Sequence, residues 1–270
     1  MKKRFFSAAG AFVVVGWLVS LLTQKFIFTE LEESHIFLFD SAFAQSTLVE
    51  PGGLSAYVAS FLTQFMIWPW AGPVIAALLY AIVIFSLSDI ALRAKAPLWL
   101  TAVAALACGC LMLCLENNAF EFQGIVAYAL AAACLWAYLR IGERGWRFLA
   151  GVVGSAAAYW ALGSVAFLPA ACAFAYELVF WRKRWWISLL YPAIVFVFGW
   201  LAVKAGVVPN MKQALTPSMY YLWNSTTYMM NYAWAAMLIF IVNVRIFDHA
   251  DEDKPKRQLV VFGIMAVAMA

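Results

Sequence analysis

Apolar residues of this chain fall into long runs that are separated by short polar connectors. About 20 helical residues cross a hydrocarbon core of about 30 Å, so runs of this length predict membrane-spanning helices. The pattern predicts one all-α, polytopic transmembrane helix bundle over residues 1–270, with about eight to nine spans. The approximate runs are Phe5–Phe28, Gly72–Ala91, Pro97–Leu115, Phe122–Leu139, Phe148–Leu162, Ser164–Phe180, Ile187–Ala205, Met229–Ile246 and a last run that begins at Leu259.

The run from Phe148 to Phe180 is 33 residues long and fits either one tilted helix or a hairpin that turns at Gly163-Ser164. The basic residues separate the two alternatives. With a hairpin, 15 of the 18 Lys and Arg residues fall in connectors on one side; with one helix the split is 10 to 8. Because basic connectors stay in the cytoplasm, the charges favour the hairpin and a cytoplasmic N-terminus in a multi-pass inner-membrane protein.

The two ends of the chain raise separate questions. The basic head followed by an apolar run is also typical of a signal peptide, but no A-x-A cleavage site follows the run directly, so we expect a retained first span. The last run stops about 12 residues in. Because a helix cannot end in mid-bilayer with its carbonyls unpaired, we expect the chain to be the N-terminal part of a longer one.

Composition supports a membrane protein and excludes several other classes. The chain is 66% hydrophobic and 12% charged, with a mean hydropathy of +0.85, whereas soluble domains are about 45–50% apolar and about 25% charged. The net charge of +4 is spread over the connectors, which argues against a nucleic-acid partner. All five cysteines lie inside apolar runs without histidine neighbours, so they are not expected to bind metal.

The longest polar segment, residues 29–73, is the predicted first outer loop. It contains five of the 14 acidic residues: Glu30, Glu32, Glu33, Asp40 and Glu50, together with His35. The spacing of its apolar residues predicts two interfacial helices, His35–Phe43 and Leu54–Trp68, on either side of a turn at Pro51-Gly52-Gly53. A plain alternative is that this loop only seals the end of the bundle.

Two further outer segments carry polar side chains. The connector Glu116–Gly124 places ionisable and amide groups at the mouth of a span, where they are costly unless used or paired. Acids at this face can bind a cation or work as general acids and bases. The region 206–228 adds Lys212 to the same predicted face.

Two resemblances follow from these stretches. The segments PGGLSAYVASFLTQFMIWPWAGP and ENNAFEFQG resemble an uncharacterised bacterial family of multi-pass membrane proteins, which implies no function. The order of one span, a long outer loop with two interfacial helices, two spans and a short acidic loop resembles the N-terminal half of membrane glycosyltransferases that use lipid-linked sugars. In that group, acids of the first and second outer loops form the site, in some members through a divalent metal.

This second resemblance implies roles for residues of both loops, with the bilayer and a polyprenyl-phosphate-linked sugar as partners and Mg²⁺ or Mn²⁺ as the ion. The sequence departs from the group in having no Asp-Asp or Glu-Asp pair in the first loop and no arginine at the outer face. The acid that matches in the first loop is Asp40 or one of Glu30, Glu32 and Glu33, and in the second loop it is Glu116 or Glu121. The implied residues are Asp40, Glu116 and Glu121 for catalysis, His35, Asn117, Asn118, Gln123 and Lys212 for substrate binding, and Glu32 and Glu33 for the metal.

Other functions stay open from the sequence. A non-enzymatic scaffold or assembly factor of the cell envelope needs only the loops and helix packing. A transporter needs charged groups or broken helices near the midplane, and no carboxylate lies near the middle of a predicted span. The sequence has no phosphate-binding glycine loop and no zinc-ligand spacing, so a soluble cofactor is not expected.

Overall fold

The structure is a computed structural model that describes residues 2–34, 37–142, 144–180, 185–222 and 229–248. These residues form α-helices and short 3₁₀ helices, with one isolated bridge between Phe120 and Tyr221. The elements are α1 (Lys2–Thr23), α2 (Lys25–Ser34), α3 (Ser41–Val49), α4 (Gly53–Thr63), η1 (Gln64–Ile67), α5 (Ala71–Arg93), α6 (Leu100–Cys114), α7 (Gln123–Arg140), α8 (Arg144–Leu162), η2 (Gly163–Ala166), α9 (Phe167–Phe180), η3 (Trp185–Ile187), α10 (Leu190–Lys204), α11 (Met211–Leu215), η4 (Pro217–Tyr220) and α12 (Met230–Asp248).

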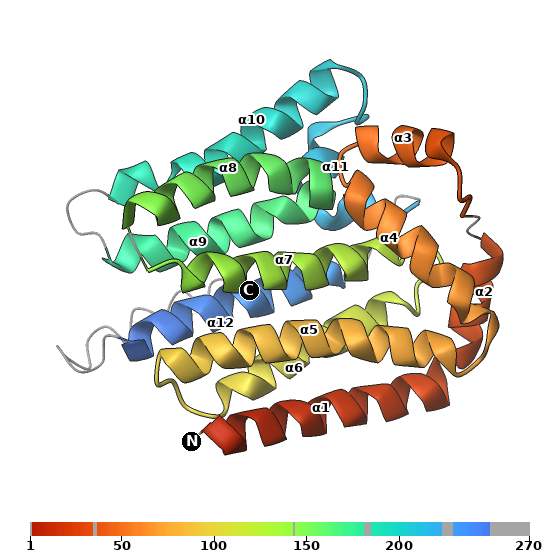
Figure 1. The fold of residues 1–270 in the computed structure, drawn as a ribbon, viewed down its shortest axis with the longest axis horizontal. Helices are drawn as coiled ribbons and strands as arrows, with labels where there is room; N and C mark the ends of the chain where they lie inside the picture. Colours follow the sequence, from red (N-terminus) through yellow and green to blue (C-terminus); the bar gives the residue numbers. More distant parts are fainter. Residues whose placement is uncertain (1, 35–36, 143, 181–184, 223–228, 249–270) are drawn as a thin grey trace.

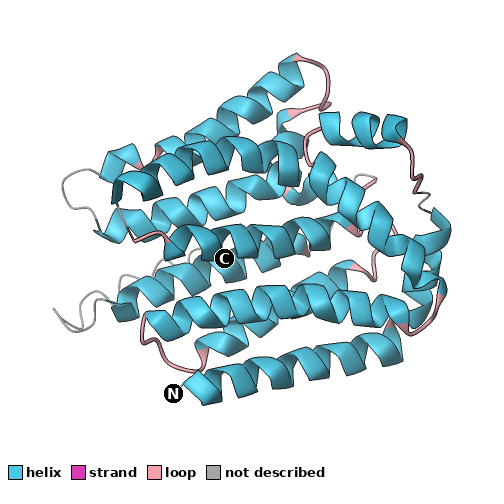
Figure 2. Ribbon diagram, viewed as in Figure 1, coloured by secondary structure: helices cyan, strands magenta, loops and turns pink. Residues whose placement is uncertain are grey.

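The long helices lie side by side and run in alternating directions, which confirms the predicted all-α bundle (Figures 1 and 2). Helix α7 lies in the interior, packed against α5, α8 and α9, and most of its first half is buried. Its Tyr128 hydroxyl donates to the Ala233 carbonyl of α12 over 2.7 Å. This bond gives a buried hydroxyl its acceptor and holds two helices at one register.

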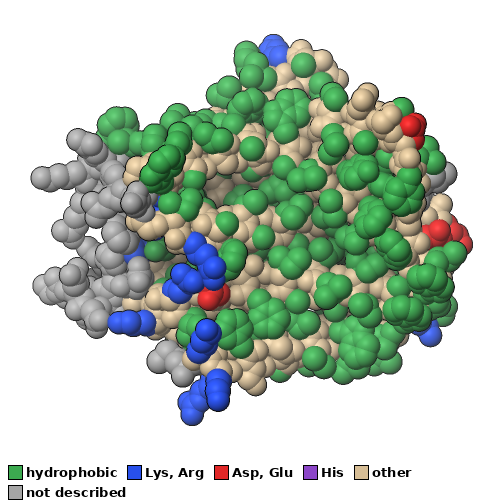
Figure 3. Space-filling model, in the orientation of Figure 1, with side chains coloured by type: hydrophobic (Ala, Val, Ile, Leu, Met, Phe, Trp, Pro, Cys, Tyr) green, Lys and Arg blue, Asp and Glu red, His purple; other side chains and the backbone are tan. Residues whose placement is uncertain are grey.

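Within the described residues, four stretches are long and apolar enough to cross a membrane: Lys2–Thr23, Ala71–Arg93, Gly145–Leu178, which comprises α8, η2 and most of α9, and Met230–Phe247. Apolar side chains such as Val15 of α1, Leu78 of α5 and Leu106 of α6 point away from the bundle, and Figure 3 shows apolar side chains over most of the visible face. A surface of this kind is stable in lipid and unfavourable in water. The protein is therefore an integral membrane protein.

The ambiguous run of 33 residues forms a hairpin, as the charge distribution predicted. Helices α8 and α9 meet at η2, and both pack against α10. Gly163 opens η2 with a φ of 69°, a left-handed conformation that glycine adopts without a steric penalty. A Cβ at this position would lie 2.7 Å from Met219 Sδ. The turn therefore depends on glycine for both its backbone angle and its close packing.

The first apolar run, Phe5–Phe28, carries polar residues at Gln24 and Lys25, and the helix breaks at this point. Helix α1 ends at Thr23 and α2 begins at Lys25. The Gln24 side chain is buried, donates to the Met112 carbonyl of α6 over 2.7 Å and accepts from Ser20 Oγ over 3.2 Å. A buried amide must satisfy its donors and acceptors, and here it does so across two helices.

Helices α3 and α4 lie at one end of the bundle, as expected for the long loop (Figure 1). The second predicted helix matches α4 and η1, but the first was misplaced: helix α3 begins at Ser41, and Phe37–Asp40 is not helical. Asp40 is its N-cap residue, a position that aspartate favours. Phe37 packs instead against the rings of Tyr57 and Phe61, with centroids 5.1 and 5.6 Å apart.

The two ends of the bundle carry opposite charge. At the basic end, which holds the start of α1, Arg93 and Arg140, Lys and Arg side chains gather (Figure 3). The acidic end holds α2–α4 and the connector 115–122, which carries Glu116 and Glu121. The predicted ninth span and the basic residues at 182–184 and 254–257 lie outside the described residues.

Replacing Gly163 with alanine is expected to lower the free energy of unfolding by about 1–3 kcal/mol, because alanine is strained at this backbone angle. Denaturant unfolding in detergent, followed by circular dichroism, measures the change. Gly154→Ala in α8 is the matched control, since a Cβ there meets nothing within 4 Å. Equal stability of the two variants would contradict the role of Gly163.

Candidate functional site

Gln123, a predicted substrate-binding residue, joins the connector 115–122 to the segment 29–73. Its Nε2 donates to the Gly52 carbonyl and to Ser55 Oγ, both over 3.1 Å. The Gly52 amide in turn donates to the Trp160 carbonyl near the end of α8 over 2.9 Å. The α3–α4 turn is therefore fixed against the start of α7 and the end of α8.

Glu121, in the connector before α7, lies beside Tyr220 at the end of η4. Its amide donates to the Tyr220 carbonyl over 2.9 Å. The buried Tyr220 hydroxyl donates to the Leu162 carbonyl and accepts from the Val165 amide. Burial raises the pKa of the Tyr220 phenol well above its usual range, and the negative charge of Glu121 raises it further. The half-buried Glu121 carboxylate therefore lies close enough to Tyr220 to act on it electrostatically.

The other predicted site residues lie in more open positions at the acidic end. Asp40, Glu33, Glu116, Asn118 and Lys212 are exposed. Glu32 is half-buried near the end of α2. Asn117 is half-buried, and its Oδ1 accepts from the Ala119 amide over 3.0 Å, which shapes the connector. His35 lies outside the described residues.

The first-loop acid nearest to the second connector along the chain is Glu50, which the sequence reasoning did not select. Asp40 and Glu50 flank the nine residues of α3, so they are separated by more than the roughly 13 Å length of that helix. Glu50 lies two residues before Gly52, whose carbonyl binds Gln123. The signal was available in the sequence, because Glu50 directly precedes the Pro51-Gly52-Gly53 turn.

A metal site at Glu32 and Glu33 stays a prediction. Within the described residues, no group of three or more His, Cys, Asp or Glu side chains is placed to hold a metal ion. His35, the histidine of this loop, is not among the residues on which that statement rests. Mg²⁺ or Mn²⁺ at these two glutamates would therefore need ligands beyond the described set or from a substrate.

The basic end contains a charged cluster that the sequence reasoning missed. Asp89 Oδ2 accepts from Arg93 Nε (2.8 Å), Trp136 Nε1 (2.9 Å) and Arg140 Nη2 (3.2 Å). The guanidinium of Arg140 also lies over the Trp136 ring, 3.7 Å from its centroid. One carboxylate thus joins α5 to α7. The spacing of Asp89 and Arg93, four residues apart on a helix, was the signal for this pair.

A second buried acid, Glu177 of α9, lies towards the same end. Its Oε1 accepts from the Tyr138 hydroxyl over 3.3 Å and lies 3.4 Å from Arg147 Nη1. An acid inside an apolar run is costly unless it is paired, and this one is paired with an arginine. Neither Asp89 nor Glu177 lies at the middle of its helix.

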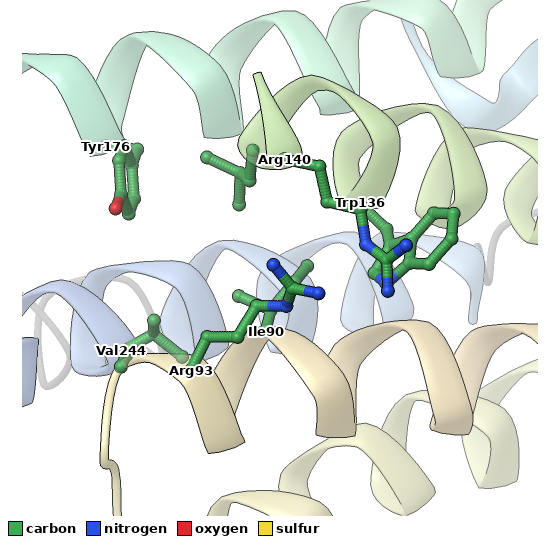
Figure 4. Close-up of a pocket in the computed structure, with 8 residues that line it drawn as sticks. Ile90, Arg93, Trp136, Arg140, Tyr176 and Val244 are labelled. Carbon is green, nitrogen blue, oxygen red and sulfur yellow. The ribbon is translucent and has the colours of Figure 1, made fainter. Parts of the chain in front are cut away.

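A cavity of about 110 Å³ opens next to the Asp89 cluster. Figure 4 shows Arg93 projecting from α5, Trp136 and Arg140 from α7, and Tyr176 from α9 around this space. Ile90 and Val244 contribute apolar wall. The cavity therefore combines guanidinium donors with apolar and aromatic surface at the end of the bundle.

Gln123→Ala is expected to lower the free energy of unfolding by about 1–3 kcal/mol, because it removes two hydrogen bonds and leaves the Gly52 carbonyl without this donor. Thermal unfolding in detergent checks the change. The control is Asn118→Ala in the same connector: Asn118 is exposed, and its replacement is expected to change stability by less than about 0.5 kcal/mol. A similar loss in both variants would argue against the Gln123 contact.

The comparisons with known proteins agree with one of the two resemblances. No curated protein and no solved structure matches the chain. A family described as "Family of unknown function (DUF6057)" matches residues 1–268. This match confirms the resemblance to an uncharacterised family, and the chain belongs to the DUF6057 family.

Proposed function

We propose that this membrane protein acts at its acidic end as a glycosyltransferase-like enzyme on a lipid-linked sugar. The observation that carries the proposal is the contact of Gln123 with Gly52 and Ser55. It joins the two outer segments whose acids the resemblance assigns to a site. Glu50 lies two residues before Gly52, and Glu121 lies two residues before Gln123. These two acids flank the contact and are therefore the catalytic candidates.

The chemistry needs a carboxylate that activates or orients an acceptor hydroxyl. Glu121 suits this role because it is half-buried and lies beside Tyr220 in a region shared by several connectors. The departing lipid phosphate needs a positive charge, which Lys212 or a bound Mg²⁺ or Mn²⁺ would supply. Glu50 at the α3–α4 turn is a candidate ligand for that ion.

The apolar surface of the acidic end is suited to a lipid-linked substrate. Trp68 and Trp70 are exposed and stack with their ring centroids 6.0 Å apart, just before α5 begins. Phe39 is also exposed. Aromatic side chains favour the membrane–water interface, where the phosphate of a lipid-linked sugar lies. This arrangement supports an approach of the substrate from the bilayer.

The proposed orientation has the basic end in the cytoplasm and the acidic end outside an inner membrane. The separation of Lys and Arg from the acidic connectors supports it, because basic connectors are retained on the cytoplasmic side. In this orientation the N-terminus is cytoplasmic. Polyprenyl-linked sugars would then be used at the outer face.

A scaffold or assembly factor of the envelope is the second candidate function. It is favoured by the aromatic packing of the acidic end, where Phe37 contacts Phe39, Phe43, Tyr57 and Phe61. These rings and the Gln123 hydrogen bonds form an ordered cap, and this order requires no catalytic residue. A partner protein would bind such a cap as a preformed surface.

A transporter has less support than either candidate. Asp89 and Glu177 lie towards the basic ends of their helices, and both are bonded to arginines. A substrate path would call for charged groups or broken helices near the midplane.

The test is a binding and turnover assay of the full chain in nanodiscs with polyprenyl-phosphate sugars, with and without Mg²⁺ or Mn²⁺. Glu121→Gln is expected to lower turnover about 10²–10⁴-fold, the usual contribution of a general acid or base, while substrate binding is retained. Glu50→Gln is expected to weaken the metal dependence. Asp40→Asn is tested beside them, because the resemblance names that residue.

The matched control is Glu30→Gln, an exposed acid of α2 at the same end that has no role in this mechanism. It is expected to keep wild-type turnover. If folded wild-type protein neither binds nor turns over any lipid-linked sugar, the enzyme proposal is wrong and the scaffold becomes the better explanation.

A further inference from the structure

We infer that the basic end holds a phosphate-binding site in the cavity between α5, α7, α9 and α12, with Arg93 and Arg140 as its ligands. This inference is independent of the proposed function, because it concerns the opposite end of the bundle. The class of ligand is a phosphate group, and the favoured source is the headgroup of an anionic phospholipid.

Among the described residues beside this cavity, two arginines share one acid. Arg93 and Arg140 both bond to the carboxylate of Asp89. Glu177 of α9 is paired with Arg147. Two guanidinium groups on one carboxylate leave this described cluster with one positive charge for an anion.

Two of these arginines have hydrogen-bond donors to spare. The contacts to Asp89 use Nε of Arg93 and Nη2 of Arg140, whereas a guanidinium carries five N–H donors in a planar fork. The Arg93 and Arg140 side chains are 54% and 43% exposed, and that of Asp89 only 17%. Asp89 therefore occupies one donor of each arginine, and the exposed remaining donors are accessible to a ligand.

The two guanidinium groups are held in place before any ligand binds. Asp89 fixes both of them, and the Trp136 ring supports that of Arg140. Pre-ordered arginines lose less conformational entropy on binding and suit the oxygens of a phosphate group. If the pairs served only to join α5 to α7, one arginine would be enough, and the second would add unbalanced charge.

The size and the walls of the cavity suit a phosphate group. Its volume is about 110 Å³, and it is partly open to the surface. Ile90 and Val244 add apolar wall beside the charged groups. The cavity lies at the end of membrane-spanning helices, where phospholipid phosphates lie. Basic pockets between helices at this depth bind anionic headgroups in other membrane proteins.

The test measures lipid binding to the purified full chain by native mass spectrometry, comparing phosphatidylglycerol with phosphatidylcholine. Arg93→Gln and Arg140→Gln are each expected to weaken phosphatidylglycerol binding about fivefold, the effect of one basic residue near an anionic lipid surface. Asp89→Asn is expected to strengthen it, because the amide oxygen can still accept from both arginines and keep them ordered, while the competing negative charge is removed.

Lys95→Gln is the matched control: Lys95 is exposed at the same end, two residues from Arg93, and does not line the cavity. It is expected to leave binding unchanged. Equal losses for Lys95→Gln and the arginine variants would show general surface attraction and overturn the inference, as would unchanged binding in both arginine variants.

A second arm separates the two sources of phosphate by competition with inorganic phosphate. Retained phosphatidylglycerol binding in millimolar phosphate supports the lipid headgroup as ligand. If inorganic phosphate displaces phosphatidylglycerol, and both Arg93→Gln and Arg140→Gln weaken this effect of phosphate, the same site binds soluble phosphate. If Asp89→Asn fails to strengthen binding of either form while the protein stays folded, the assignment of these arginines is wrong.

Discussion

The hydrocarbon core of a bilayer contains no water that could hydrogen-bond to backbone or side-chain amides. The rest of this structure depends on that constraint. It restricts the spans to helices, whose amides bond within each helix. It also explains the few polar side chains inside the bundle. Gln24 bonds to the Met112 carbonyl and Tyr128 to the Ala233 carbonyl, so each of these two side chains joins two helices.

The same constraint gives the two ends of the bundle different roles. At the acidic end, water reaches the connectors, and acids such as Asp40 and Glu116 stay exposed while Gln123 and Tyr220 bond the connectors together. At the basic end, Asp89 and Glu177 lie within their helices and are paired with arginines. Chemistry at the acidic end and anion binding at the basic end are therefore separate proposals with separate tests.

The acidic end combines order with accessibility. The Gln123 contact fixes where the α3–α4 turn meets the start of α7, and the rings around Phe37 fix how α4 lies. Both an enzyme and a scaffold benefit from this order, because each needs a preformed surface. Glu121 distinguishes the two functions, since its half-buried carboxylate beside Tyr220 is needed for chemistry but not for a surface cap.

The sequence by itself determined the helical class, the limits of most spans and the α8–α9 hairpin, because apolar run length and the distribution of basic residues are local or additive properties. It misplaced the start of α3, because Phe37 packs against Tyr57 and Phe61 of α4 instead of entering a helix. Only the tertiary structure decided that Gln123 meets Gly52 and that Arg140 meets Asp89, 51 residues away. Contacts of that kind depend on which helices become neighbours, and no local pattern in the chain encodes that choice.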